Sequence, residues 1–128
     1  MRTLSVKQPW ASLIVAGIKR VENRTWSTNH RGPLVIHASA RPDPEAGPTL
    51  ELAGIDPQDW QDAPRGVVLG VVELVDVIDM ASAGVKSRAL AHDPLACGPF
   101  CWILSNPRPL AKPIPARGRL VLWDWNPS

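Results

Sequence analysis

The chain has 128 residues, of which 45% are hydrophobic and 20% charged, as expected for one folded domain spanning residues 1–128. No apolar segment approaches the length of a membrane-spanning helix, and the N-terminus lacks a signal-peptide pattern, so we expect a cytoplasmic protein with no membrane partner. The two cysteines, Cys97 and Cys101, lack a second ligand pair, and the three histidines show no metal-ligand spacing. We therefore expect no metal and no cofactor.

The net charge of +2 conceals an uneven distribution along the chain. Residues 1–41 carry seven basic side chains and one acidic one, residues 42–79 carry one basic and nine acidic, and residues 80–123 carry six basic and one acidic. If the two basic segments lie together, they form a positive face suited to phosphate-bearing partners. A sequence pI near 8.8 argues against strong unspecific binding to long duplexes, which needs many phosphate contacts.

The N-terminal segment predicts a strand over residues 2–6, followed by one short helix. Pro9 suits the first helical position, where its missing N–H costs nothing. The residues at helical spacing that predict an apolar side are Trp10, Leu13, Ile14 and Ile18. Gly17 then takes the place where a helix favours a left-handed residue, so we expect the helix to end there.

A group of polar residues follows directly after this predicted helix. Lys19 comes first, and Glu22, Arg24 and Trp26 then share one parity. In extended backbone, side chains of one parity lie on the same face. Two interpretations fit this pattern: a solvated charged turn with an ordinary Glu–Arg pair, or a small polar cleft that binds an anionic or planar ligand.

The middle of the chain predicts a buried strand, a surface excursion and a second strand. Residues 34–39 form a short apolar run that fits a strand buried on both faces. Residues 41–64 carry five prolines and half of the acidic side chains, so we expect a surface segment with weak helices at 49–53 and 57–62. Residues 66–79 are rich in β-branched side chains and predict the longest strand, with a bend or bulge at Gly70.

Glu73 stands out in that strand because the other residues of its parity are aliphatic. Burying a lone carboxylate is costly, so this group must be protonated, paired with a cation or placed at an opening. Two interpretations stay open: a structural ion pair with a nearby arginine, or a carboxylate aimed into a ligand cleft.

The C-terminal third predicts a helix near 87–92 and strands at 100–104 and 119–125. Residues 106–115 contain four prolines, which lack the backbone donor that a central strand needs, so we expect no central strand there. Five or six short strands with one good helix predict an α+β, mainly β domain. Its expected form is a small curved sheet or barrel with helices at its ends.

Residues 17–24, GIKRVENR, fit the signature G-x-K-x-x-E-x-R and thereby resemble ASCH domains, which are similar to PUA domains. Further blocks resemble the family in the same order, namely SVKQPW at 5–10, as in one bacterial and phage branch, RGPLVIHA at 31–38, GPF at 98–100 and NPRP at 106–109. The resemblance covers nearly the whole chain. It implies a small PUA-like β-barrel of five or six strands with a short N-terminal helix and minor helices, and a cleft beside that first helix.

The first functional hypothesis is a binding module, because the ASCH family is linked to RNA. The resemblance implies RNA or a modified nucleoside as the partner of what we expect to be a monomer. The side chains expected to bind it are Lys7, Gln8, Arg24, Trp26, Arg31 and Trp102. Arginine and lysine hold phosphates or base edges, and a tryptophan stacks on a base. A protein-interaction domain is a third possibility that no residue pattern favours.

The second hypothesis is an enzyme. Some bacterial ASCH proteins are amidohydrolases that deacylate N4-acetylcytidine with the motif lysine, a motif threonine as nucleophile and a glutamate from elsewhere, and a ribonuclease activity is also associated with the family. Here the lysine is Lys19, Glu22 occupies the threonine position, and Glu73 is the further candidate carboxylate. Glu22 would activate water as a general base while Lys19 stabilises the oxyanion. A glutamate cannot replace a hydroxyl nucleophile without changing the mechanism, so the sequence ranks binding ahead of hydrolysis.

Overall fold

One sheet, wrapped around the helix that follows its first strand, organises the chain. The computed structural model describes residues 1–82 and 84–127. In chain order the elements are β1 (Arg2–Val6), α1 (Trp10–Val15), β2 (Val21–Arg24), β3 (Gly32–Ala38), α2 (Ala46–Leu52), the 3-10 helix η1 (Pro57–Trp60), β4 (Val67–Asp79), α3 (Val85–Leu90), β5 (Phe100–Pro115) and β6 (Leu122–Asp124). Within the described residues the strands form a six-stranded sheet in the order β2-β5-β4-β3-β1-β6, in which only β1 and β3 run parallel.

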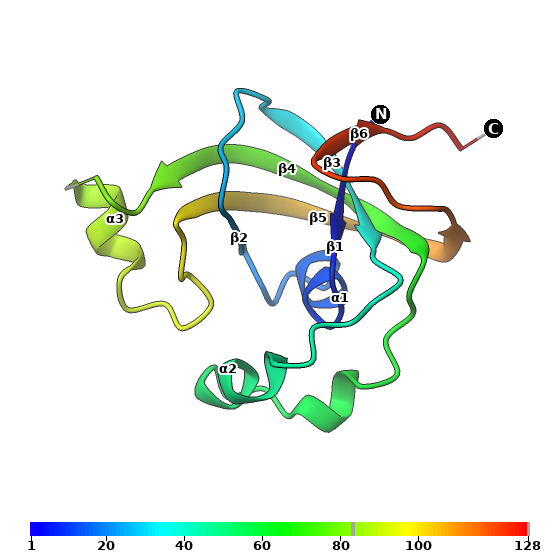
Figure 1. The fold of residues 1–128 in the computed structure, drawn as a ribbon, viewed down its shortest axis with the longest axis horizontal. Helices are drawn as coiled ribbons and strands as arrows, with labels where there is room; N and C mark the ends of the chain where they lie inside the picture. Colours follow the sequence, from blue (N-terminus) through cyan, green and yellow to red (C-terminus); the bar gives the residue numbers. More distant parts are fainter. Residues whose placement is uncertain (83, 128) are drawn as a thin grey trace.

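The sheet curls into a half-barrel whose concave side holds α1 (Figure 1). α1 packs against β3, β4 and β5, and its apolar side chains join those of the strands in the main core. A second, smaller cluster lies on the other side of α1, where α2 and η1 cover Leu13. This arrangement confirms the predicted fold class, a mainly β domain with a curved sheet and a helix near the N-terminus.

The first helix starts later than predicted, and its apolar side is shorter than predicted. It begins at Trp10, one residue later than expected, and Pro9 occupies the capping position with a φ of −85°. Gly17 adopts a φ of +78°, which confirms the predicted left-handed residue after the helix. Ile18 lies beyond that turn and is 47% exposed, so it does not join the apolar side of the helix.

Strand β4 is bent at Gly70, as predicted. The register shifts beside this glycine against both β3 and β5, and a Cβ placed there would lie 2.6 Å from the carbonyl oxygen of Arg108. Only glycine therefore allows β5 to approach so closely. The irregularity also changes which alternate residues of β4 face the core. Odd-numbered Leu69 before Gly70 and even-numbered Val72 and Leu74 after it all belong to the main core.

Strand β5 is longer than the sequence suggested. β2 pairs only with Phe100–Ile103, so the proline-rich half of β5 has β4 on one side and no strand of the described chain on the other. Prolines are tolerated in such an edge position because no neighbouring strand needs their missing N–H. Residues 106–115 thus form a strand that pairs on one side only. This confirms the prediction that they do not form a central strand.

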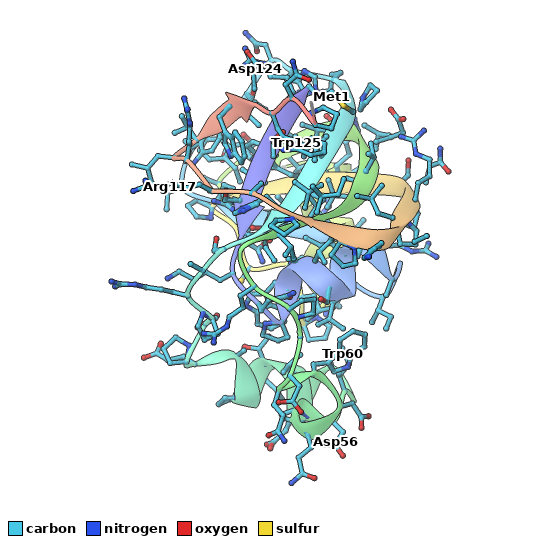
Figure 2. The ribbon with its side chains drawn as sticks, turned by 90° about the vertical axis from the view of Figure 1, so that its right-hand side faces the viewer. Met1, Asp56, Trp60, Arg117, Asp124 and Trp125 are labelled. Carbon is cyan, nitrogen blue, oxygen red and sulfur yellow. The ribbon has the colours of Figure 1, made fainter. Side chains whose placement is uncertain are left out.

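The chain ends next to its beginning. The backbone N–H of Trp125 donates to the carbonyl of Met1 at 2.9 Å, and the amino group of Met1 donates to the carbonyl of Trp125, also at 2.9 Å, so the termini lie side by side (Figures 1 and 2). The strand predicted at 119–125 is shorter than expected, because β6 covers only Leu122–Asp124. The residues before it run irregularly across the surface, and Val121 has a φ of +53°.

Candidate functional site

A cavity of about 970 Å³ opens between β1 and β2, which are not neighbours in the sheet. Its walls come from the ends of β1 and β3, from β2 and the residues after it, and from residues 117–121 before β6. Arg24 joins the two sides, since its guanidinium donates to the carbonyl of Ser5 at 2.9 Å. A volume of this size lies within the range of small-molecule sites in proteins.

Lys19, Glu22 and Arg24 form what we call the inner cluster of this cavity. The Lys19 Nζ donates to Glu22 Oε1 at 2.9 Å, and the Arg24 guanidinium donates to Glu22 Oε2 through Nε at 3.0 Å and Nη2 at 2.8 Å. Lys19 also donates to the carbonyl of Val21. With Lys19 only 3% exposed and Glu22 7%, the cluster is a buried, internally paired group of charges.

Local structure explains why these residues meet. After the left-handed turn at Gly17, the N–H groups of Ile18 and Lys19 both donate to the carbonyl of Leu13 at 3.0 Å, which fixes the start of the motif on the helix end. β2 follows in extended conformation, so Glu22 and Arg24 lie on the same face. The spacing of the motif therefore places Lys19 just beyond the end of α1 and places Glu22 and Arg24 on one face of β2, where the three side chains meet.

The inner cluster determines the protonation of Glu22. Burial alone would raise the pKa of this carboxyl, but the charges of Lys19 and Arg24 and their hydrogen bonds outweigh burial and hold its pKa below the ordinary value. Glu22 is therefore an anion at neutral pH. A general base works best when its pKa lies near the working pH, so the lowered pKa makes Glu22 a weak base.

Two half-buried tryptophans line the same cavity. The Trp10 indole N–H donates to Asp43 at 2.8 Å, and the Lys19 Nζ lies 5.7 Å from the centroid of the Trp10 ring. Trp26 meets the buried Trp102 edge to face, with ring centroids 4.9 Å apart. Aromatic rings placed beside a charged group in a cavity suit a planar ligand that also carries polar atoms.

Four exposed cations surround the mouth of the cavity, and we call them the rim cations. They are Lys7, Arg41, Arg117 and Arg119. None of these four side chains makes a hydrogen bond or an ion pair with another residue in the part of the chain that the structure describes. Because β1 lies between β3 and β6, the two basic segments of the sequence contribute to one cavity. One acidic side chain, Asp43, also lines the cavity. Asp56 and Trp60 lie away from Arg117, in what we call the lower lobe, the part of Figure 2 formed by α2 and η1.

The structure brings five of the nine predicted site residues to the cavity. These are Lys7, Lys19, Glu22, Arg24 and Trp26. The other four lie elsewhere, each for a different physical reason.

Glu73 and Trp102 are not cavity residues. The change of parity at the Gly70 bulge turns Glu73 away from the core, and its carboxylate pairs with Arg108 on β5 at 2.7 Å. This corrects its expected place in a catalytic cleft in favour of the structural ion pair. Trp102 has no exposed surface and belongs to the main core, where its indole N–H donates to the carbonyl of Trp26 at 3.3 Å. It supports a cavity residue but is too deeply buried to stack on a ligand.

Gln8 and Arg31 also have structural contacts in place of the expected ligand contacts. The buried Gln8 side chain accepts from the N–H of Ser12 at 2.9 Å, which caps α1, and donates to the carbonyl of Pro64 at 2.7 Å. Arg31 is exposed outside the cavity lining, where it donates to the carbonyl of Thr28 at 2.9 Å.

Sequence reasoning missed Arg41, Arg117 and Arg119, and assigned Trp10 mainly to the core. All four line the cavity. The uneven charge distribution was the one signal that pointed toward the arginines, but it named no residue. They reach the motif only through strand order, because β1 pairs with both β3 and β6.

Two features are absent from the residues that the structure describes, namely a cluster of metal-ligating side chains and a membrane-spanning helix. Among residues 1–82 and 84–127, no three His, Cys, Asp or Glu side chains gather in a way that could hold a metal ion. Nor does any helix in that part of the chain have the length and apolar character needed to cross a membrane.

Solved structures share the fold of this chain. The fold is similar to the crystal structure of ASCH from Zymomonas mobilis, with a TM-score of 0.52 over 89% of this chain and 72% of that chain at 16% identity. The S128A mutant of the Zymomonas mobilis protein gives a TM-score of 0.51 at the same identity and coverage. The chain thus has the fold of these ASCH structures, a mainly β domain with a curved sheet.

The family follows from the sequence. The ASCH domain family model matches residues 4–114, and the chain belongs to this family, as the GIKRVENR motif predicted. Activating signal cointegrator 1 from Homo sapiens is 38% identical over 126 residues, and its Mus musculus counterpart is 36% identical over the same length. Each match covers 94% of this chain but only 21% of the relative, so the chain spans about a fifth of the length of these proteins.

Proposed function

We propose that this domain binds RNA or a modified nucleoside in the cavity, with a base inside and phosphates at the mouth. The observation that carries the proposal is the set of four unpaired rim cations around a cavity that two tryptophans also line. Cations without a protein partner keep their charge available for phosphate, and an indole ring stacks on a base of any identity. The known association of the PUA-like fold with RNA supports the same partner class.

The inner cluster gives the ligand a direction. Both carboxylate oxygens of Glu22 already accept from Lys19 and Arg24, so the cations of the inner cluster are occupied, whereas the rim cations are open to phosphate. The phosphates are then expected near the exposed cations and the base near Trp26. We propose that a monomer binds the ligand. Cytoplasmic location stays a prediction from the sequence.

Trp26→Leu tests the proposal. Loss of a stacking ring is expected to weaken the binding of a short single-stranded RNA by about 1–3 kcal/mol, or roughly five- to 150-fold, in a fluorescence anisotropy titration at low salt. Trp60→Leu is the matched control, because Trp60 is also half-buried but lies outside this cavity, against the small cluster beneath α1. Circular dichroism of both variants establishes that the fold persists.

Two results would contradict binding in the cavity. One is a wild-type protein that binds neither short RNA nor modified nucleosides at low salt. The other is a folded Trp26→Leu variant whose affinity equals that of the wild type while Trp60→Leu loses affinity, which would move the site to the lower lobe.

Hydrolysis of an acylated cytidine or of RNA is a second candidate, favoured by the 2.9 Å contact between Lys19 and Glu22 at the cavity wall. The lowered pKa of Glu22 opposes a role as general base, so we expect no turnover when the wild type is incubated with N4-acylated cytidines and short RNAs. Turnover that disappears in Glu22→Gln, with RNA affinity retained, would instead make the domain an enzyme.

A further inference from the structure

Residues 116–121 form a segment that we call the strap, and its residues 117–121 form one wall of the cavity. It carries Arg117 and Arg119, two of the four rim cations, together with Leu120, which is 89% exposed. The strap lies beyond residue 114, where the match to the family model ends.

Contacts beneath the strap hold it in place. The Nε2 of the buried His37 donates to the carbonyl of Ala116 at 2.7 Å, while its Nδ1 accepts from the Ser5 hydroxyl at 3.0 Å. A Cβ added at Gly118 would lie 2.7 Å from His37 Cε1 and 2.8 Å from Ser5 Oγ. Real Cβ atoms do not approach so closely, so a glycine is required for the strap to rest on β1 and β3. Val121, at a φ of +53°, shows that tertiary contacts override the local preference of a β-branched residue.

The tight contact at Gly118 leaves the residues on either side of it at the surface. Arg117 and Arg119 are both exposed and unpaired among the described residues. Lys7 and Arg41 reach the same cavity from the ends of β1 and β3, so the four cations come from three separate segments around one mouth. A nucleoside carries no phosphate and would leave all four unpaired, whereas the backbone of an oligonucleotide offers a phosphate at every step.

We propose that the strap is a phosphate-binding element set by the Gly118 contact, and that the cavity takes an oligonucleotide with several phosphates, not a free nucleoside. This inference rests on the proposed function and chooses between its two ligand classes. Gly118 acts as a positioning residue, while Arg117 and Arg119 contact the phosphates.

The salt dependence of binding tests the role of the arginines. For single-stranded nucleic acid, the slope of log K against log salt changes by about 0.7 for each phosphate contact. Between about 50 and 200 mM salt, the Arg117→Ala/Arg119→Ala variant should lose about 1.4 of the wild-type slope with a short single-stranded RNA. Arg20→Ala/Arg88→Ala is the matched control, since both arginines are exposed and outside the cavity lining, and it should keep the slope. Arg117→Lys/Arg119→Lys keeps both charges and should keep it too.

Gly118→Ala tests the position of the strap without changing any charge. The added methyl group must displace either the strap or the hydrogen-bonded side chains of His37 and Ser5 beneath it. We expect the strap to move, so that the salt slope and the affinity both fall although the arginines are intact. Gly47→Ala is the control, because a Cβ at Gly47 meets no atom within 4 Å and should leave both quantities unchanged.

The possible results distinguish the hypothesis that the strap binds phosphates from the hypothesis that the cavity binds RNA or a nucleoside. An unchanged salt slope in Arg117→Ala/Arg119→Ala, with RNA still bound, overturns the proposal that the strap binds phosphates but leaves the cavity as the binding site. Equal affinity of the wild type for RNA and for its constituent nucleosides, with little salt dependence, overturns the choice of an oligonucleotide. Failure of the wild type to bind either ligand overturns both proposals.

Discussion

The inner cluster and the rim cations lie in one cavity but differ in almost every physical respect. Lys19 and Arg24 are held by Glu22 through three hydrogen bonds of 2.8–3.0 Å, largely out of water. The rim cations are exposed and have no partner among the described residues. A buried charge needs its partner for stability, whereas an exposed cation without a partner is available to a ligand.

This difference predicts a division of labour between the two groups. Mutations in the inner cluster should change the free energy of unfolding, and mutations at the rim should change affinity and its salt dependence. If the two groups had the same role, mutations in either group would change both the free energy of unfolding and the affinity.

Lys19→Met should have the largest effect. Removing one partner of a buried ion pair typically costs about 3–5 kcal/mol, and we expect about 3 kcal/mol in the free energy of unfolding because Glu22 keeps Arg24. Urea denaturation measures this loss. Lys112→Met, at an exposed position on β5, is the control and should change stability by less than about 0.5 kcal/mol. Equal stabilities of the two variants would contradict the structural role of the inner cluster.

Glu22→Gln should have an intermediate effect that depends on pH. Since the folded-state pKa of Glu22 is depressed, its contribution to stability is fully present above the ordinary value of 4.5 and is lost as the pH falls through the lower folded-state pKa. The glutamine keeps an acceptor oxygen for Lys19, and Lys19 keeps the carbonyl of Val21, so the variant should be less stable than the wild type by about 1–3 kcal/mol at neutral pH. The difference should shrink below pH 4.5. Thermal or urea unfolding over a pH series measures it, and a difference independent of pH would count against the ion pair.

Lys7→Ala and Arg41→Ala should have the smallest effect on stability. Both side chains are exposed and unpaired in the described chain, so we expect changes in the free energy of unfolding within about 0.5 kcal/mol. Each should lower the salt slope of RNA binding by about 0.7, if each contacts one phosphate. A variant that loses stability but keeps the wild-type slope would reverse the roles assigned to the two groups.

Much of the fold could be predicted because local pattern and structure agree. The apolar spacing after Pro9 gives α1, and the β-branched run gives β4 with its irregularity at Gly70. The proline-rich half of β5 was harder, because proline excludes only a strand paired on both sides. Sequence alone does not reveal where β2 stops pairing.

The inner cluster could be predicted for the same reason, since Lys19, Glu22 and Arg24 are close in sequence and local geometry brings them together. The position of Glu73 could not be predicted, because the irregularity at Gly70 changes whether the odd-numbered residues of β4 face the core or the surface. The arginines of the strap depend on the pairing of β1 with β6, a contact between the two ends of the chain. Long-range strand order is the information that a residue pattern lacks.

The most direct test of the cavity as the binding site is an NMR titration of the six tryptophan indole N–H groups with a short single-stranded RNA. Trp10 and Trp26 line the cavity, while Trp60 lies in the lower lobe (Figure 2). We predict saturable shifts of the Trp10 and Trp26 resonances and none at Trp60. Shifts at Trp60 with Trp10 and Trp26 unmoved would contradict binding in this cavity.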